Sequence, residues 1–352
     1  MRVLVSNVTS YKAVVIINFL KKSYKDIFIV GIDSILLSKI FHISSINRYY
    51  YVKFDKNYIQ SIKDLIIKNR IDIFLPTHSS EMTMVLENKL KLNKTLDYYS
   101  NIDKFNKIND KDSLSTLCKQ LNIPTPKKFS KLSVANGPCV VKPKVSAGSK
   151  GVYYLKNKND YEQFFKKNKN CKNSIIQQYV RGAGAGYSLF SSKGKIIIGH
   201  GHIRLAEYPV SGGSSVYRKS FNDDRMIDIS KKIISHLQWS GFAMIEFKIA
   251  NNGDLYLIEI NPRIWGSINQ GLINGINYFS CILGKADNIK RTNINYRTYL
   301  SPLIYLSFFY YLINLNFKPI IHFLKSIKKN KADVNFFTQI RAWISILLRY
   351  LT

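Results

Sequence analysis

The sequence predicts an α/β unit, then an α+β unit, then a helical tail, and three observations lead to this expectation. Strand-like and helix-like segments alternate through residues 1–100, glycine-rich turns separate strand-like runs through residues 101–290, and residues 291–352 are apolar, aromatic and basic. Alternating strands and helices are typical of a parallel sheet covered by helices, whereas strands joined by tight turns are typical of antiparallel sheets. We therefore expect three domains with these boundaries, the first of them Rossmann-like.

The first unit alternates short buried strands with amphipathic helices. Residues 3–5, 27–33 and 71–75 are apolar runs closed by turn signals, and residues 11–22 and 59–68 carry apolar side chains at helical spacing. No GxGxxG sequence follows the first strand, so the chain shows no dinucleotide-binding fingerprint.

The middle unit contains seven runs that predict strands, and Asn252-Gly253 between the last two is a strong hairpin signal. These runs are residues 138–142, 152–155, 174–179, 187–190, 196–198, 242–249 and 255–260.

The net charge is the most unusual bulk property. The chain has 53 Lys and Arg against 22 Asp and Glu, a formal net charge of +31. Such an excess indicates an anionic partner such as nucleic acid, a membrane surface or phosphorylated substrates. Biased residue usage competes with that interpretation, because Lys, Asn, Ile, Tyr and Phe are all abundant and the charge is spread along the chain. We expect no specific nucleic-acid partner; residues 49–53, YYYVK, are the best local candidate and suit a strand equally well.

The tail contains a stretch, residues 298–317, that has no charged residue and the length of a membrane-spanning helix. Ser301, Asn314 and Asn316 oppose a span, so we expect a helix packed on the body of the protein, with peripheral membrane contact as an alternative. Residues 343–351 predict a second apolar helix.

The cysteines and the first residues indicate a cytoplasmic protein, with membrane association as an alternative. None of the cysteines is spaced as a metal-ligand pair, so we expect reduced thiols at Cys118, Cys139, Cys171 and Cys281. Polar residues interrupt the apolar run after Met1, so we expect no signal peptide.

The segment CVVKPKVSAGSKGVYYL, residues 139–155, predicts a phosphate site. A strand delivers Lys142, and a loop of small residues, 146–151, can bring backbone N–H groups close to phosphate oxygens. A tight hairpin with an incidental lysine is the alternative.

The segment MIEFKIANNGDLYLIEINPRIWGS, residues 244–267, predicts a metal site. Residues two apart on a strand face the same side, so Glu259 and Asn261 point together, and Glu246 on the paired strand can join them. Two carboxylates and an amide oxygen suit Mg²⁺ held between protein and nucleotide phosphates. Arg263 follows, placed to meet an anionic group. A solvated hairpin face is the alternative.

The order of strand lysine, small-residue loop and E…E-x-N-P-R resembles the ATP-grasp superfamily. Within it, the chain is most similar to carboxylate–amine ligases and to the ATP-binding domain of the carbamoyl-phosphate-synthase large chain. The resemblance covers roughly residues 1–290, including LPTHSSE at residues 75–81. It implies an N-terminal pre-grasp domain and an ATP-grasp domain of two α+β subdomains, with residues 115–180 as the small lid.

The resemblance also implies the nucleotide contacts. Lys111 and Lys142 are similar to the two ATP lysines, with Lys104 and Lys107 as competitors for the first role. The loop that closes over the phosphates is represented by Ser146, Gly148, Ser149 and Gly151, and the hinge that holds adenine by Gln177, Gln178, Tyr179 and Val180. Two departures stand out: the hinge begins with Gln instead of Glu, and the glycine-rich residues 181–186 stand where many relatives hold the ribose with Glu.

Three further roles follow from the resemblance. Glu246, Glu259 and Asn261 are similar to the metal ligands, and Arg263 to the arginine that stabilises the acyl phosphate. Residues 200–220 resemble an H-x-R-x-x-E-x-P-x-x-GG-x-S stretch of one subgroup, in which Arg204 would meet a phosphate or substrate carboxylate and Glu207 would orient it. A structural Arg–Glu ion pair and a β-turn are the alternative.

The expected activity is therefore that of an ADP-forming ligase. ATP would convert a carboxylate into an acyl phosphate, which an amine then attacks, with two Mg²⁺ ions, or Mn²⁺ in their place. The expected partners are small-molecule carboxylates and amines, and a homo-oligomer is compatible with the sequence. The alternative function is a basic protein that binds nucleic acid or a membrane surface and retains the fold without ligase activity.

Overall fold

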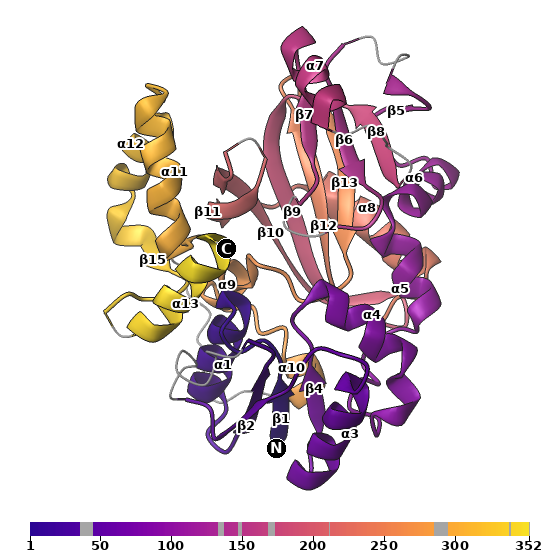
Figure 1. The fold of residues 1–352 in the computed structure, drawn as a ribbon, viewed down its shortest axis with the longest axis vertical. Coiled ribbons are helices and arrows are strands. Elements are labelled where there is room, and N and C mark those ends of the chain that lie inside the picture. Colours follow the sequence, from indigo (N-terminus) through magenta and orange to yellow (C-terminus); the bar gives the residue numbers. More distant parts are fainter. Residues whose placement is uncertain are drawn as a thin grey trace.

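The protein was analysed as a computed structural model, which describes residues 1–35, 45–132, 137–146, 150–167, 173–210, 212–284, 295–337 and 339–351. Within these residues the strands form three sheets, and most of the helices lie on the outside of the sheets (Figure 1).

The N-terminal sheet is parallel, as the alternation of strands and helices predicted. Its strand order is β3-β2-β1-β4. The chain adds β2 and β3 on one side of β1 and then returns to add β4 on the other side. Ser10 caps the first helix by accepting a hydrogen bond from the Ala13 N–H at 3.4 Å. The elements are β1 (Arg2–Val5), α1 (Tyr11–Ser23), β2 (Phe28–Asp33), β3 (Arg48–Tyr51), α3 (Tyr58–Asn69), β4 (Ile73–Leu75) and α4 (Ser79–Glu87).

A sheet of seven strands forms the centre of the molecule, in the order β13-β12-β9-β10-β11-β14-β15. All but the last pair of neighbours are antiparallel. The expected strands 187–190 and 196–198 are parts of much longer ones. The elements are β9 (Gly182–Ser192), β10 (Lys195–Tyr208), β11 (Ser214–Ser220), α8 (Asp224–His236), β12 (Gly241–Ala250), β13 (Leu255–Asn261), α9 (Ile268–Leu272), α10 (Ser280–Leu283), β14 (Arg297–Tyr299) and β15 (Asn330–Ala332).

A third sheet, in the order β5-β8-β6-β7, has a small core of its own. Val141, Phe164 and Ile176 are buried in this core, apart from the large core that the other two sheets share. The third sheet is therefore packed around its own cluster of apolar side chains. The elements nearby are α5 (Ile102–Asn109), α6 (Lys111–Gln120), β5 (Lys128–Phe129), β6 (Cys139–Pro143), β7 (Tyr153–Leu155), α7 (Lys158–Lys167) and β8 (Ser174–Gln178).

The C-terminal residues are helical only in part. The edge strands β14 and β15 extend the central sheet, and Asp333 is buried in an ion pair with Arg218 of β11. The uncharged stretch 298–317 contains the last two residues of β14, a helix over Ser301–Ile313 and the turn that follows it. The chain cannot continue as a helix there, because Leu315 has a φ of 53°. Among the described residues, no helix combines the length and the apolarity needed to cross a membrane. The helices are α11 (Ser301–Ile313), α12 (Lys318–Lys325) and α13 (Ile340–Leu351).

Candidate functional site

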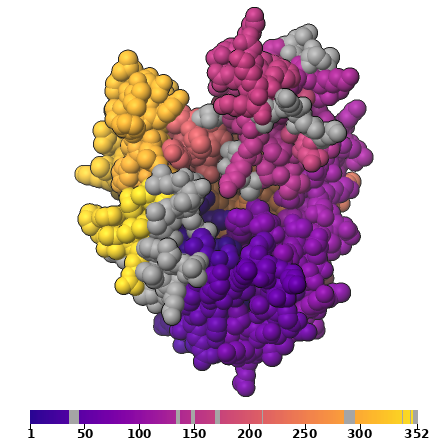
Figure 2. Space-filling view, in the orientation of Figure 1, coloured from indigo at the N-terminus to yellow at the C-terminus, as the bar shows by residue number. Residues whose placement is uncertain are grey.

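A pocket of about 690 Å³ lies where the three sheets meet, and Figure 2 shows the surface hollowed between the magenta and indigo parts of the chain. That volume is in the range of small-molecule sites. Most of the described lining residues come from the starts of α1 and α4, from the segment between β6 and β8, from β9 to β13 and the turn after β13, and from α13.

Two carboxylates stand on the floor of the pocket. Glu246 of β12 and Glu259 of β13 are directly opposite each other in the antiparallel register, and both are less than one-third exposed. The Asn261 amide nitrogen lies between them, donating to Glu246 Oε1 at 3.0 Å and to Glu259 Oε1 at 3.4 Å. The hairpin therefore brings together the three residues predicted as metal ligands.

Two buried lysines face Glu259. Lys111 begins α6, and its Nζ lies 3.4 Å from Glu259 Oε2 and 3.2 Å from Ser146 Oγ. Lys142 of β6 is 6% exposed and donates to the Ile258 carbonyl at 3.3 Å. Burial alone would raise the pKa of Glu259, but Lys111 and Lys142 lower it below its ordinary value. Burial lowers the pKa of Lys142 to about 8, although Glu259 opposes that shift.

Arg204 links Glu246 to Glu207. Its guanidinium forms an ion pair with Glu246 and another, at 3.2 Å, with Glu207 Oε1, and it also donates to the Gly213 carbonyl at 3.3 Å. Burial alone would lower the pKa of Arg204, but the charges of Glu246 and Glu207 raise it. Among the described residues, the buried Arg204 Nε has no hydrogen-bond partner. The ion pair between Arg204 and Glu207 is thus present. Both residues line the pocket, and Arg204 also contacts a second carboxylate, that of Glu246.

The glycines of β9 allow Arg204 to reach β12. Strand β9 lies between β10 and β12, so Arg204 must cross it to contact Glu246. A Cβ at Gly184 would lie 2.8 Å from Arg204 Cδ, and a Cβ at Gly186 would lie 2.6 Å from His202 Cε1. The glycine-rich segment expected near the ribose is therefore a strand whose missing side chains make room for His202 and Arg204.

Arg263 lies behind the carboxylate pair. It is 9% exposed, and its guanidinium donates to Asn261 Oδ1 at 2.7 Å and to the Ile264 carbonyl at 3.0 Å. Burial lowers its pKa from the ordinary value. Arg263 therefore fixes the orientation of Asn261 while lining the pocket.

The predicted hinge lines the same pocket. Gln177 is buried, and Gln178, Tyr179 and Val180 follow it at the pocket wall. The N–H groups of Gln178 and Tyr179 already donate to the carbonyls of Lys127 and Pro138, at 2.8 and 3.0 Å. These bonds fix the end of β8 to its neighbours.

The predicted phosphate loop is described only at its ends. Ser146 lines the pocket and accepts from Lys111, whereas Gly148 and Ser149 lie outside the described residues. Gly151 has a φ of 74° and closes the loop beside Pro143 without lining the pocket.

Other lining residues were not predicted individually as site residues. Lys150 and Tyr154 belong to the segment around the loop, but Lys12, His78 and Ile346 come from distant parts of the chain. The polar turns after β1 and β4 were the only signal for Lys12 and His78, since the carboxyl ends of parallel strands meet at one edge.

The donor set fits a hard cation only in combination with a ligand. The described residues contain no group of three His, Cys, Asp or Glu side chains that could hold a metal alone. Glu246 and Glu259 offer two carboxylates with Asn261 beside them, and Mg²⁺ is typically held by one or two carboxylates together with substrate phosphates. The residues therefore fit Mg²⁺ that arrives with a nucleotide.

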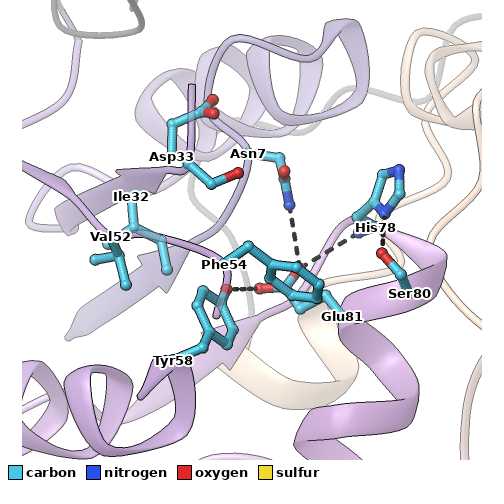
Figure 3. Close-up of a pocket in the computed structure, with 10 residues that line it drawn as sticks. Asn7, Ile32, Asp33, Val52, Phe54, Tyr58, His78, Ser80 and Glu81 are labelled. Atoms are coloured by element: carbon cyan, nitrogen blue, oxygen red, sulfur yellow. Dashed lines mark hydrogen bonds between the residues drawn. The ribbon is translucent and has the colours of Figure 1, made fainter. Parts of the chain in front are cut away.

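A second, smaller pocket of about 230 Å³ lies at the carboxyl edge of the N-terminal sheet (Figure 3). Its buried acid, Glu81, accepts hydrogen bonds from Ser6 Oγ at 2.5 Å, from Asn7 Nδ2 at 3.2 Å and from the Tyr58 hydroxyl. Burial raises the pKa of Glu81, and the hydrogen bonds from Ser6 and Tyr58 oppose that shift. None of the three side chains that donate to Glu81 is cationic.

Comparison with known proteins identifies the central part of the chain. The ATP-grasp domain family matches residues 106–267. These residues are an ATP-grasp domain. It contains Lys111, Lys142, Arg204, Glu246 and Glu259, the charged groups that surround the pocket floor.

Two curated relatives match at low identity. One is the carbamoyl phosphate synthase large chain of Clostridium acetobutylicum, 19% identical over 228 residues, which are 60% of this chain and 21% of the relative. The other is the D-alanine–D-alanine ligase of Fusobacterium nucleatum subsp. nucleatum, 26% identical over 164 residues, which are 43% of this chain and 55% of the relative. The chain thus spans about a fifth and about half of these two proteins.

Solved structures share the fold beyond the ATP-grasp domain. An L-amino acid ligase from Bacillus licheniformis superimposes with a TM-score of 0.62 at 14% identity, covering 80% of this chain and 73% of that one. The biotin carboxylase domain of Hydrogenobacter thermophilus 2-oxoglutarate carboxylase, solved with MgADP, superimposes with a TM-score of 0.60 at 16% identity, covering 79% and 67%.

Proposed function

We propose that the protein is a Mg²⁺- and ATP-dependent ligase that activates a substrate carboxylate as an acyl phosphate for attack by an amine. The observation that carries the proposal is the pocket floor of the ATP-grasp domain, where Glu246 and Glu259 stand opposite each other among Lys111, Lys142 and Arg204. Buried carboxylates next to buried cationic side chains suit a triphosphate and its metal ion. Phosphoryl transfer needs positive charge and exact positioning of the reactants more than it needs a covalent nucleophile.

In the first step, a carboxylate oxygen of the substrate attacks the γ-phosphorus of ATP, and the bond to the β-phosphate oxygen breaks to release ADP. In the second step, the amine attacks the acyl carbon, inorganic phosphate leaves with the bonding electron pair, and the amine loses a proton. A carboxylate is a poor electrophile, so the phosphate leaving group is what makes the second step feasible. Mg²⁺, when bound, neutralises charge on the phosphates.

The residues of this chain would divide the work as follows. Lys111 and Lys142 bind phosphate oxygens, and the low pKa of Lys142, about 8, leaves it charged at neutral pH. Glu246 and Glu259 would hold the cation, and Asn261 would join them by turning its Oδ1, which now accepts from Arg263, toward the ion. Arg263 and Arg204 orient the carboxylate and its acyl phosphate, and Glu207 positions Arg204.

The nucleotide would lie between the lid and the central sheet. Residues 177–180 would hold the adenine along the end of β8, and Ser146 with the rest of its loop would exclude water from the phosphates. Two Mg²⁺ ions, or Mn²⁺, complete this assignment.

The domain division is part of the same proposal. Residues 1–100 would be a Rossmann-like pre-grasp domain, 101–290 the ATP-grasp domain with 115–180 as its lid, and 291–352 the tail. The pocket supports this division, because the first of these parts contributes Lys12 and His78 to the pocket wall. We propose that the carboxylate and amine bind against that wall.

The test is ADP release by the full chain across a panel of small carboxylates paired with amines. We expect at least one pair to accelerate ADP release, and Glu259→Gln to abolish that acceleration while Glu162→Gln, on the exposed face of α7, leaves it unchanged. If no pair raises ADP release above the Glu259→Gln level, the proposal of a ligase is overturned, and binding of nucleic acid to the wild type would support the alternative without ligase activity.

A further inference from the structure

The hairpin of α11 and α12 exposes an unusual amount of apolar surface. These helices form the lobe at the upper left of Figures 1 and 2. Each presents large apolar side chains at helical spacing toward solvent, and every one is close to half exposed or more. We call this set the hairpin face: Tyr305, Phe309 and Leu312 on α11, and Phe317, Ile321 and Leu324 at α12.

The opposite sides of the same helices are anchored. Leu303, Ile304 and Ser307 of α11 are buried, and Ser307 Oγ donates to the Glu207 carbonyl at 3.0 Å. Phe323 of α12 packs on Phe308 with ring centroids 5.2 Å apart. The packed inner side therefore holds the exposed side chains in place at the surface. Contiguous apolar patches of this kind mark interaction sites.

The charge around the hairpin face selects the kind of partner. Between Asp287 and Asp333 the sequence contains no acidic residue, and Asp333 is buried against Arg218. Lys318, Lys325, Lys328 and Lys329 are exposed on α12 and just after it. An apolar face flanked by lysines alone is complementary to an anionic membrane surface, where the side chains insert among the acyl chains and the lysines meet the headgroups.

We propose that the hairpin face binds the surface of membranes that contain anionic lipids, so that α11 and α12 lie in the interface without crossing the bilayer. The aromatic residues suit this depth, because Tyr is enriched at the membrane–water interface and Phe is typical of the apolar face of interfacial helices. Since Ser307 joins α11 to the carbonyl of Glu207, the face lies on the element next to the pocket, which would place the site at the membrane surface.

The experiment is flotation of the full chain with vesicles of phosphatidylcholine, with and without phosphatidylserine. We expect binding only with phosphatidylserine, weakened by added salt. Phe309→Gln with Leu324→Gln should weaken partitioning about tenfold or more. Lys328→Gln with Lys329→Gln should weaken it about thirtyfold, because each lysine near an anionic surface contributes about one kcal/mol.

Matched controls separate this role from general effects. Ile67→Gln with Leu90→Gln changes two apolar residues elsewhere that are also more than half exposed, and Lys166→Gln with Lys167→Gln changes two adjacent exposed lysines of α7. Neither control should alter binding.

The proposal is overturned if the wild type does not float, if the controls lose as much binding as the hairpin variants, or if only the lysine pair matters, which would indicate a polyanion. It is also overturned if light scattering shows a dimer that the Phe309 and Leu324 changes dissociate, because a second copy would then cover the face.

Discussion

The Glu246–Glu259 pair and Glu81 are buried carboxylates that differ in the charge of their partners. Lys111 and Lys142 face Glu259, and Arg204 faces Glu246, whereas the side chains that donate to Glu81 are those of Ser6, Asn7 and Tyr58. The two lysines lower the pKa of Glu259, whereas burial raises the pKa of Glu81 and, despite the opposing charge of Arg204, that of Glu246. Glu259, which Lys111 and Lys142 face, therefore stays ionised and can exchange partners with an incoming cation and anion. Glu81, among hydroxyl and amide groups, ties strand ends together instead.

The largest expected effect is the loss of ATP turnover when the negative charge of Glu259 is removed. Glu259→Gln should reduce ATP turnover by about a hundredfold or more, because it removes a cation ligand and leaves Lys111 and Lys142 without their counter-charge. Thermal unfolding should show a folded protein, since the side chain keeps its shape. Turnover within a few-fold of wild type, measured by ADP release, would contradict the assignment.

The cations of the pocket can be tested through pH. Since the pKa of Lys142 is lowered to about 8, its charge is lost near pH 8 in the free protein, and kcat/KM for ATP should fall about tenfold per pH unit above that value. Bound nucleotide stabilises the charged form, so kcat should fall only at higher pH. Lys142→Arg should abolish the fall in whatever activity it retains. A flat kcat/KM profile up to pH 9.5 would show that the charge of Lys142 does not matter.

A smaller effect should follow from crowding Arg204. Gly184→Ala places a Cβ 2.8 Å from Arg204 Cδ and 2.9 Å from Glu207 Oε1, so the guanidinium must shift away from Glu246. We expect a several-fold loss of kcat/KM for the carboxylate substrate. Ser188→Ala on the same strand is the control, because its buried hydroxyl has no described hydrogen-bond partner. Equal activity of both variants would separate Arg204 from the reaction.

For Glu81 we expect a substitution to change stability but not activity. Glu81→Gln should leave ATP turnover per folded molecule unchanged and cost about 1–2 kcal/mol of unfolding free energy through weaker hydrogen bonds. Because folding raises the pKa of Glu81, its contribution is fully present below its ordinary pKa of 4.5 and is lost as pH rises through the folded value. The melting temperature of wild type relative to the variant should therefore decline from pH 4.5 upward. Loss of turnover at unchanged stability would place Glu81 in the reaction instead.

Local patterns were enough to predict the carboxylate pair. The Asn252-Gly253 turn fixes the hairpin, and the two-residue period of a strand then places Glu246, Glu259 and Asn261 on one face. The ATP-grasp fold followed from the motifs around them, and the match of residues 106–267 confirms it. The roles given to the individual side chains stay predictions.

Contacts between distant segments could not be predicted from the pattern. Arg204 reaches Glu246 across β9, and only the pairing of three strands reveals why Gly184 and Gly186 are needed there. Likewise, the uncharged residues 298–317 gave no sign that one side of α11 would be buried and the other exposed. The composition of these residues shows that they are apolar, whereas the burial of each side chain depends on which other segments pack against it in the fold.

The most direct measurement is the affinity for ATP with and without Mg²⁺, by calorimetry, for wild type and Glu259→Gln. The account predicts that Mg²⁺ strengthens ATP binding to the wild type and has little effect on binding to the variant, since the pair opposite Lys111 and Lys142 would hold the ion. Equal strengthening by Mg²⁺ in both proteins would contradict the central claim that Glu246 and Glu259 form the cation site of the pocket.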